Sequence, residues 1–136
     1  MIHFDERWIT ISWDPHIEAV VAEWKGFAES KDFRAGLEAG LELARQKRAR
    51  RWLADTLRGP PSTQADQKWT SEIWFPRVIV AGVRWMALVV PQSAITRMSL
   101  KGIMSKVTTE SLTQAYFEDA ASARAWLAAT PRFGPG

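Results

Sequence analysis

Residues 50–69, RRWLADTLRGPPSTQADQKW, decide the fold because they contain a strand, a loop and the start of a helix. The run RWLAD at 51–55 is short and largely apolar, which predicts a buried strand. The residues Gly59-Pro60-Pro61 predict a loop, since glycine and proline punctuate regular structure. Residues 64–75 then repeat apolar side chains at helical spacing. A buried strand that leads into a helix is the repeating unit of an α/β protein with a parallel sheet.

The segment before this unit predicts a hairpin and a long helix. Residues 8–13, WITISW, alternate between two faces, and residues 17–24, IEAVVAEW, run back after the turn Asp14-Pro15-His16. Ser30 is expected to cap the helix that follows. One face of that helix holds small and apolar residues, which suits a close approach of its backbone to a sheet: Phe33, Gly36, Leu37, Gly40, Leu41 and Ala44.

The segment after the unit continues the alternation of strands and helices. Pro76 is expected to break the helix of 64–75, because proline cannot continue the hydrogen-bond ladder, and a second short turn is expected up to Gly82. The remaining expected elements are a strand at 84–90 (RWMALVV) covered on both faces, a weak helix at 93–106, a strand at 112–117 and a last helix capped by Asp119.

The order of these elements, β-β-α-β-α-β-α-β-α, predicts an α/β fold. Alternating units of this kind form a mostly parallel sheet, here with an antiparallel first hairpin. We predict a single domain over residues 1–129, followed by a frayed C-terminal tail at 130–136.

The composition excludes several kinds of chemistry. The chain of 136 residues has no Cys, which excludes disulfides, thiolate catalysis and Cys-ligated metal sites. Its charged N-terminus, MIHFDERW, does not resemble a signal peptide. The longest apolar stretch, 78–91, is interrupted by Arg84 and is too short to span a bilayer. We therefore predict a cytoplasmic protein with no transmembrane segment and no cofactor.

Charge and histidine placement indicate no further site. The formal net charge is +3, and the basic residues cluster only at Lys47, Arg48, Arg50 and Arg51. Cations at the end of a helix are typical partners of the helix dipole, so we predict no nucleic-acid partner. The two histidines, His3 and His16, lack neighbours that would complete a metal site or a Ser nucleophile with its base. We predict no catalytic or metal-binding residue and no enzymatic activity.

Two hydroxyl residues, Ser62 and Thr63, precede the helix of 64–75. Either hydroxyl can cap that helix by accepting a hydrogen bond from its free N–H groups. Either is also a candidate phosphoacceptor, because a phosphate suits a helix N-terminus and Arg58 and Lys68 lie nearby in the sequence. We favour the capping role.

Eight tryptophans are the feature of the composition that demands an explanation. Most of them lie on expected strands or inward helix faces, where packing into the core is the default. Trp69 and Ile73 share one face of the helix of 64–75, so we expect that Trp74 and Phe75 cannot both point inward as well. The group Trp69, Trp74 and Phe75 is therefore our candidate for a partner interface or for an apolar pocket.

Three stretches resemble a known family: residues 23–55 (EWKGFAESKDFRAGLEAGLELARQKRARRWLAD), 74–91 (WFPRVIVAGVRWMALVVP) and 116–128 (YFEDAASARAWLA). They are similar to the SpoIIAA-like proteins, small bacterial single domains of the STAS/Sec14 type that are mostly uncharacterised. The resemblance covers about residues 7–129 and implies a non-enzymatic regulatory or ligand-binding domain. In the anti-sigma-factor antagonists of this group, a serine within Asp-Ser-Ser-Gly is phosphorylated, and this chain has Pro61-Ser62-Thr63-Gln64 near that position.

Three hypotheses for function follow. The first is a regulatory domain that binds a protein partner or a second copy of itself, with a contact surface at residues 56–82. The second is a carrier or sensor of a small apolar or lipid-like ligand, held between the helix of 64–75 and the segment 93–106. The third is a phosphoswitch at Ser62 or Thr63, as in the anti-sigma-factor antagonists.

Overall fold

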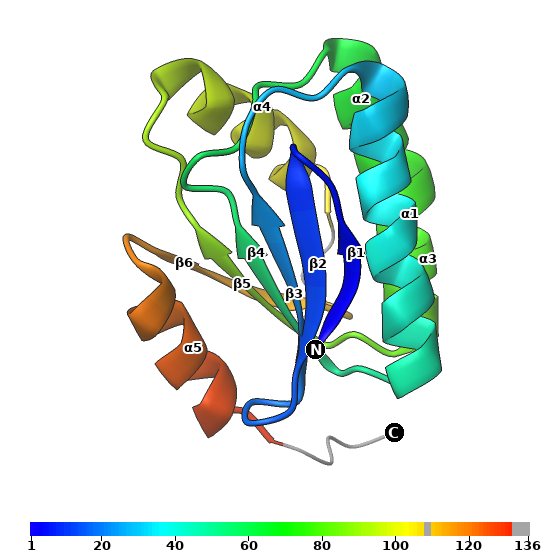
Figure 1. Ribbon diagram of the computed structural model, residues 1–136, viewed down its shortest axis with the longest axis vertical. Coiled ribbons are helices and arrows are strands. Elements are labelled where there is room, and N and C mark those ends of the chain that lie inside the picture. The colour runs from blue at the N-terminus through cyan, green and yellow to red at the C-terminus, as the bar shows by residue number, and fades with distance from the viewer. Residues whose placement is uncertain (108–109, 132–136) are drawn as a thin grey trace.

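Six strands form one mixed sheet, in which each strand lies next to its neighbour in the sequence (Figure 1). The computed structural model describes residues 1–107 and 110–131. The strands are β1 (Ile2–Asp5), β2 (Ile9–Asp14), β3 (Ala19–Trp24), β4 (Arg51–Asp55), β5 (Trp85–Val89) and β6 (Thr113–Phe117). The pairs β1–β2 and β2–β3 are antiparallel, and β3 to β6 are parallel to one another. The predicted α/β class and the antiparallel hairpin ahead of parallel strands are confirmed.

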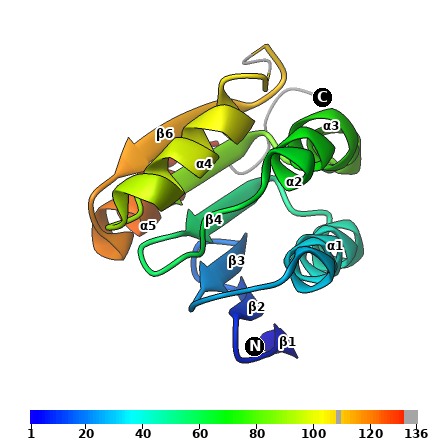
Figure 2. The same ribbon diagram turned by 90° about the horizontal axis from the view of Figure 1, so that it is seen from above.

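The helices cover the two faces of the sheet unequally. They are α1 (Ser30–Lys47), α2 (Gln64–Trp69), the π-helical segment η1 (Thr70–Trp74), α3 (Phe75–Ala81), α4 (Ala94–Met104) and α5 (Ala120–Ala129). Figure 2 shows α1, α2, α3 and α4 on one side of the sheet and α5 on the opposite side. The apolar core is accordingly double, with a larger cluster under α1 to α4 and a smaller one under α5.

The predicted hairpin is β2 and β3, which pair from Ile9 opposite Trp24 to Asp14 opposite Ala19. The alternation read from the sequence sets its faces, because Ile9 and Ile11 are fully buried under α1 while Thr10 is half-buried. The Asp14 side chain accepts a hydrogen bond from the backbone N–H of His16, as expected of an aspartate that stabilises a turn.

One strand was not predicted. β1 lies at the edge of the sheet, and its register against β2 shifts between Ile2 and Phe4. Its sequence, IHFD, is short, and it mixes polar and apolar side chains without the β-branched run that marked β2. Such an irregular edge strand depends on pairing with its neighbour more than on its own pattern.

The predicted break at Pro76 is wrong. Helical backbone runs from Gln64 to Ala81 through Pro76, which lies in the first turn of α3. Proline lacks an N–H group and crowds the carbonyl four residues before it. The wider turn of η1, directly ahead of α3, accommodates both defects and keeps the chain helical.

The helix caps follow the sequence in one case and depart from it in another. Asp119 caps α5 as predicted, because its carboxylate accepts from the backbone N–H of Ser122. Ser30 does not cap α1: the cap residue is Glu29, and the Ser30 hydroxyl donates instead to the Asp66 carboxylate, 2.7 Å away. The Ser30 hydroxyl, which the sequence predicted to cap α1, therefore bonds to the buried Asp66 carboxylate instead.

The glycines of α1 allow its backbone to approach the sheet closely, as the sequence predicted. A Cβ atom at Gly40 would lie 2.4 Å from Cη2 of Trp52, and one at Gly36 would lie 3.1 Å from Cδ1 of Ile9. Glycine at these two points therefore lets the α1 backbone lie directly on the side chains of β2 and β4.

The end of the domain is tied to the sheet. Arg51, which is buried at the start of β4, donates from Nε to the Thr130 hydroxyl at 2.9 Å and from Nη1 to the Ile17 carbonyl at 2.7 Å. Of the tail predicted at 130–136, Thr130 is thus held in place, and residues 132–136 lie outside the described residues.

Candidate ligand pocket beneath helix α4

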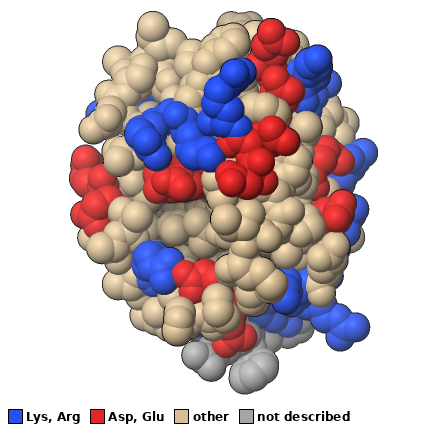
Figure 3. Space-filling view, in the orientation of Figure 1, with Lys and Arg blue, Asp and Glu red and all other residues tan. Residues whose placement is uncertain are grey.

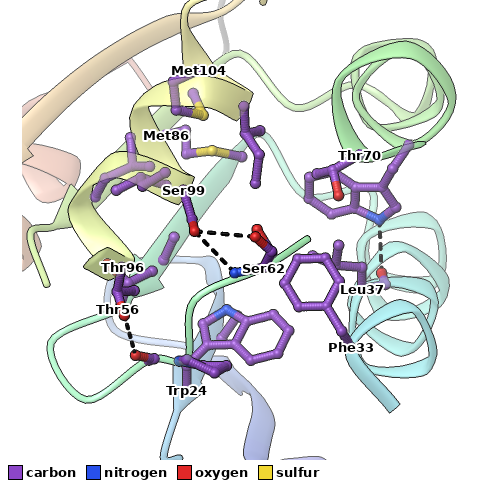
Figure 4. A pocket seen from close by; sticks show the side chains of 18 of the residues that line it. Trp24, Phe33, Leu37, Thr56, Ser62, Thr70, Met86, Thr96, Ser99 and Met104 are labelled. Carbon is purple, nitrogen blue, oxygen red and sulfur yellow. Dashed lines mark hydrogen bonds between the residues drawn. The ribbon is translucent and has the colours of Figure 1, made fainter. Parts of the chain in front are cut away.

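An apolar cavity of about 80 Å³ lies between the sheet and the helices on its more heavily covered side. Its floor is formed by β3, β4 and β5, one wall by α1, η1 and α3, the other wall by α4, and its roof by the loop that follows β4. Figure 4 shows these side chains around the cavity, with Phe33 and Leu37 at the right, Met86 and Met104 at the top and Trp24 at the bottom.

The sheet supplies the apolar floor through the period of two that governs strands. Every second residue of β3, β4 and β5 points to this face, and the lining residues are Ala22 and Trp24, Trp52 and Ala54, and Met86 and Leu88. Two of these six positions are alanines, so the floor leaves space where larger side chains would fill it. The cavity is therefore built into the strand pattern.

Hydroxyl groups interrupt the apolar lining, and four of them donate to backbone carbonyls. Thr56 donates to Val89 at 2.5 Å, Thr70 to Asp66 at 2.7 Å, and Thr96 to Gly59 at 3.1 Å. Ser99 donates to the Ser62 carbonyl at 3.3 Å and accepts from the Ser62 N–H at 3.0 Å. Thr96 and Ser99 thus connect α4 to the roof loop.

The fifth hydroxyl in the lining, that of Ser62, is the exception. Its Oγ atom is buried and has no hydrogen-bond partner among the described residues, although the backbone of the same residue is bonded to Ser99. In Figure 4, Ser62 lies between α4 and the aromatic wall. A buried hydroxyl without a partner costs free energy, so this atom is a ready site for a polar group of a bound molecule.

The candidate aromatic residues lie in different places. Trp74 and Phe75 are both buried and both line the cavity, and the Trp74 indole N–H donates to the Leu37 carbonyl at 2.8 Å. Our expectation that these two cannot both point inward is wrong. Trp69 is half-buried, and the guanidinium carbon of Arg34 lies 5.1 Å from the centre of the Trp69 ring. Ile73 is 43% exposed.

The sequence pattern misled because polar residues occupy the inward face. Asp66 and Thr70 are buried one turn apart, in line with Trp74 and Val78. A search for apolar periodicity passes over the first two and selects Trp69 and Ile73 instead. The four-residue spacing of Thr70, Trp74 and Val78 was the feature of the sequence that could have identified the buried face.

The two candidate phosphoacceptors have distinct surroundings. The Ser62 oxygen is buried in the cavity wall, as described above. Thr63 caps α2, because its Oγ1 accepts from the backbone N–H of Asp66 at 3.1 Å, which is the capping role that we favoured for these hydroxyls. The expected cation Arg58 pairs instead with Glu23, 3.3 Å away.

Asp66 joins α2 to α1 next to this cap. Its carboxylate is buried and accepts from the Ser30 hydroxyl at 2.7 Å and from Nε of Arg34 at 2.8 Å. Burial by itself would raise the pKa of Asp66, but the hydrogen bonds from Ser30 and Arg34 outweigh it and hold the pKa below its usual value. The cluster therefore contains a stable carboxylate that fixes α2 to α1, which forms part of one cavity wall.

The other acid near the roof loop is Asp55, at the end of β4. Burial raises its pKa, and the nearby Glu23 carboxylate adds to this effect. Asp55 accepts from the Leu57 N–H, which is a turn contact, and it does not belong to the cavity lining.

The described residues contain no group of three or more His, Cys, Asp or Glu that could hold a metal ion. Within the same part of the chain, no helix has the length and apolar character needed to cross a membrane. Over the upper part of the face in Figure 3, Lys and Arg side chains lie directly beside Asp and Glu side chains. Lys25 with Asp5 and Arg58 with Glu23 are ion pairs of this kind.

Comparison of the chain with models of protein families, with curated proteins and with solved structures finds no match. The fold and the cavity therefore define the class of protein by themselves. It is an α/β domain with a six-stranded mixed sheet that encloses an apolar cavity beneath α4.

Proposed function

We propose that this domain binds a small apolar molecule in the cavity beneath α4 and acts as its carrier or sensor. The observation that carries the proposal is the cavity itself, which is lined by apolar side chains and by hydroxyls but by no charged residue of the described chain. Apolar pockets with a few polar groups are the usual form of small-molecule sites.

The resemblance to SpoIIAA-like domains supports the same proposal. The sheet is compatible with this resemblance, since each parallel strand is added beside its predecessor and the connecting helices α1 to α4 share one face. Members of the uncharacterised branch of that group are suspected of binding apolar ligands or partner proteins.

The test uses tryptophan fluorescence, because Trp24, Trp52 and Trp74 line the cavity and report on its contents. Titration with straight-chain alcohols from 1-butanol to 1-octanol is expected to change the emission in a saturable way. Native mass spectrometry of freshly purified protein is expected to show a bound molecule in addition to the free chain.

A variant that fills the cavity provides the control. Ala54→Leu adds three carbon atoms to the floor and is expected to abolish saturation, whereas Ala65→Leu on the exposed side of α2 leaves it unchanged. Thermal unfolding of both variants establishes that they fold. Absence of saturable binding in the native protein, or equal binding by Ala54→Leu, would count against the proposal.

A second proposal, association of two copies through residues 56–82, is favoured by a different observation. Ile73 and Val80 are 43% and 87% exposed on the outer side of η1 and α3, although both are large and apolar. Gel filtration with light scattering at micromolar concentration tests it. A dimer that dissociates in the double variant Ile73→Ser, Val80→Ser supports the proposal, and a monomeric native protein contradicts it.

A phosphoswitch at Ser62 or Thr63 is the third proposal and has the least support, since one hydroxyl is buried and the other caps α2. Phosphorylation of Thr63 would also place a second negative charge beside the Asp66 carboxylate. Mass spectrometry of the protein isolated from its native cells tests this proposal through the fraction of phosphorylated chain.

A further inference from the structure

The Ser62 hydroxyl sets the chemistry of the ligand. Thr56, Thr70, Thr96 and Ser99 each donate their hydrogen to a backbone carbonyl, so only their oxygen lone pairs remain for a bound molecule. Within residues 1–107 and 110–131, the Ser62 Oγ has no partner, and it can both donate and accept. It is therefore the one hydroxyl of the lining that can donate to a ligand without breaking a bond.

A second polar atom lies close to Ser62. The Ser99 oxygen is within hydrogen-bond distance of both the N–H and the carbonyl of Ser62 and keeps a free lone pair. A ligand hydroxyl here can accept from Ser62 and donate to a neighbouring oxygen such as that of Ser99. A carbonyl group could only accept, so it would make one of these two bonds.

Charge is disfavoured at the same place. The cavity lining contains no Lys, Arg, His, Asp or Glu of the described chain, so a carboxylate or an ammonium group would be buried without a counterion. The cost of burying an unpaired charge exceeds what a single donor can return. A neutral group therefore suits this lining better than a charged one.

The volume of the cavity limits the size of the ligand. About 80 Å³ is smaller than the roughly 150 Å³ of an engineered cavity that holds benzene. Met86 and Met104 line the cavity, and methionine side chains adapt easily to irregular space. Short aliphatic molecules fit this description better than long acyl chains.

We propose that the ligand of this cavity is a neutral, compact aliphatic molecule with a hydroxyl group, and that this group bonds to the Ser62 hydroxyl. The inference rests on the proposed function, because it specifies the chemistry of the molecule bound in the same cavity. It assigns Ser62 as the residue that determines specificity, while the apolar floor supplies most of the contact.

The experiment compares four probes of equal chain length: 1-butanol, 1-chlorobutane, butyrate and butylammonium. Dissociation constants are measured at pH 7 from the shifts of backbone amide signals in NMR spectra of labelled protein. 1-Butanol is expected to bind with shifts at Ser62 and Ser99, 1-chlorobutane is expected to bind more weakly, and the two charged probes are expected not to saturate.

The matched variants are Ser62→Ala and Ser105→Ala. Ser62→Ala removes a buried group that has no partner, so the variant is expected to fold normally. It should weaken binding of 1-butanol by about 3- to 10-fold and leave 1-chlorobutane unchanged. Ser105 is exposed at the end of α4, and its replacement should leave both probes unchanged.

The outcomes separate this inference from the function on which it rests. Binding of butyrate as tight as that of 1-butanol, or an equal effect of Ser62→Ala on 1-butanol and 1-chlorobutane, would overturn the inference and leave the proposed function standing. Failure of all four probes, together with failure of the longer alcohols, would overturn both.

Discussion

At the scale of single residues, Asp66 is a buried side chain whose ionisation contributes to stability. Because hydrogen bonds from Ser30 and Arg34 hold its pKa below the usual value, the folded state favours the carboxylate. A lowered pKa means that this stability is present above the pKa of the unfolded chain, about 3.8 to 3.9, and is lost as the pH falls through the lower folded value. Acid should therefore loosen the contact between α1 and α2.

Asp66→Asn is expected to reduce the free energy of unfolding at pH 7 by about 1–3 kcal/mol, since it weakens hydrogen bonds to a charged acceptor. The variant should also lose the part of the acid sensitivity that the Asp66 carboxylate confers. Urea unfolding at pH 7 and at pH 3 measures both effects. The control is Glu72→Gln, an exposed acid on η1, for which a change as large as that of Asp66→Asn would contradict this account.

Gly40 carries a second prediction at this scale. Gly40→Ala should stabilise an isolated helix by about 1 kcal/mol, yet its Cβ would lie 2.4 Å from Cη2 of Trp52. We expect a net destabilisation of about 1–3 kcal/mol from this overpacking. The loss should be smaller when measured in a Trp52→Phe background, which removes the crowded ring. Gly26→Ala, with no neighbour within 4 Å, is the control in denaturant unfolding.

The residue scale is also where the sequence predicted least. Asp119 could be assigned as a cap from its neighbours, because the hydrogen bond that it accepts is local. Ser30 could not, because its partner Asp66 lies 36 residues away. The same limit applies to Ser62, whose missing partner is a property of the surrounding cavity and not of the loop sequence.

At the scale of elements, strands and helices could be predicted wherever the apolar pattern was clean. β2 begins with alternating apolar and polar residues, whereas β4 is largely apolar and β5 is a continuous apolar run, and the positions of all three agree with the sequence to within two residues. The helical run 64–81 has no clean apolar pattern. Its segment η1 contains a wider turn, and the buried face of the run includes the polar residues Asp66 and Thr70. A pattern built on apolar residues and an α-helical period therefore broke the run at Pro76 and assigned Ile73 to the wrong face.

α4 is the element that we expect to open first. Its backbone approaches α2 and η1, and the hydroxyls of Thr96 and Ser99 connect it to the roof loop. Thr96→Val preserves the shape of the side chain and removes the bond to Gly59, so amide hydrogen exchange within 94–104 should accelerate by about 5-fold. Met98→Ala, at an exposed site of the same helix, should change the exchange rates far less. Equal acceleration in both variants would contradict the role of the hydroxyl.

At the scale of the whole molecule, the sheet separates two cores of unequal size. The larger one is enclosed by α1 to α4 and includes the cavity, whereas α5 alone covers the smaller one, over β4, β5 and β6. The alternation of strands and helices predicted the layers. It could not predict the cavity, because the space depends on how side chains from three strands and four helical segments meet.

The attachment of α5 gives the last prediction. Arg51 binds the Ile17 carbonyl in the β2–β3 turn and the hydroxyl of Thr130, the residue that follows α5. Arg124 of α5 pairs with Asp14, at the end of β2. The turn is therefore connected both to α5 and to the residue after it. Arg51→Lys retains the charge but cannot reproduce the forked geometry of the guanidinium. We expect the free energy of unfolding to fall by about 2–4 kcal/mol, since buried polar groups lose their partners.

Denaturant unfolding with Arg48→Lys as the exposed control measures this loss. Hydrogen exchange then locates it: the amides of α5 should lose protection more than those of α1, because α1 packs on the opposite face of the sheet. Equal loss in both helices would mean that the two cores unfold as one unit and that Arg51 stabilises the molecule as a whole. Selective loss in α5 would show that the face away from the cavity can loosen while the cavity stays intact.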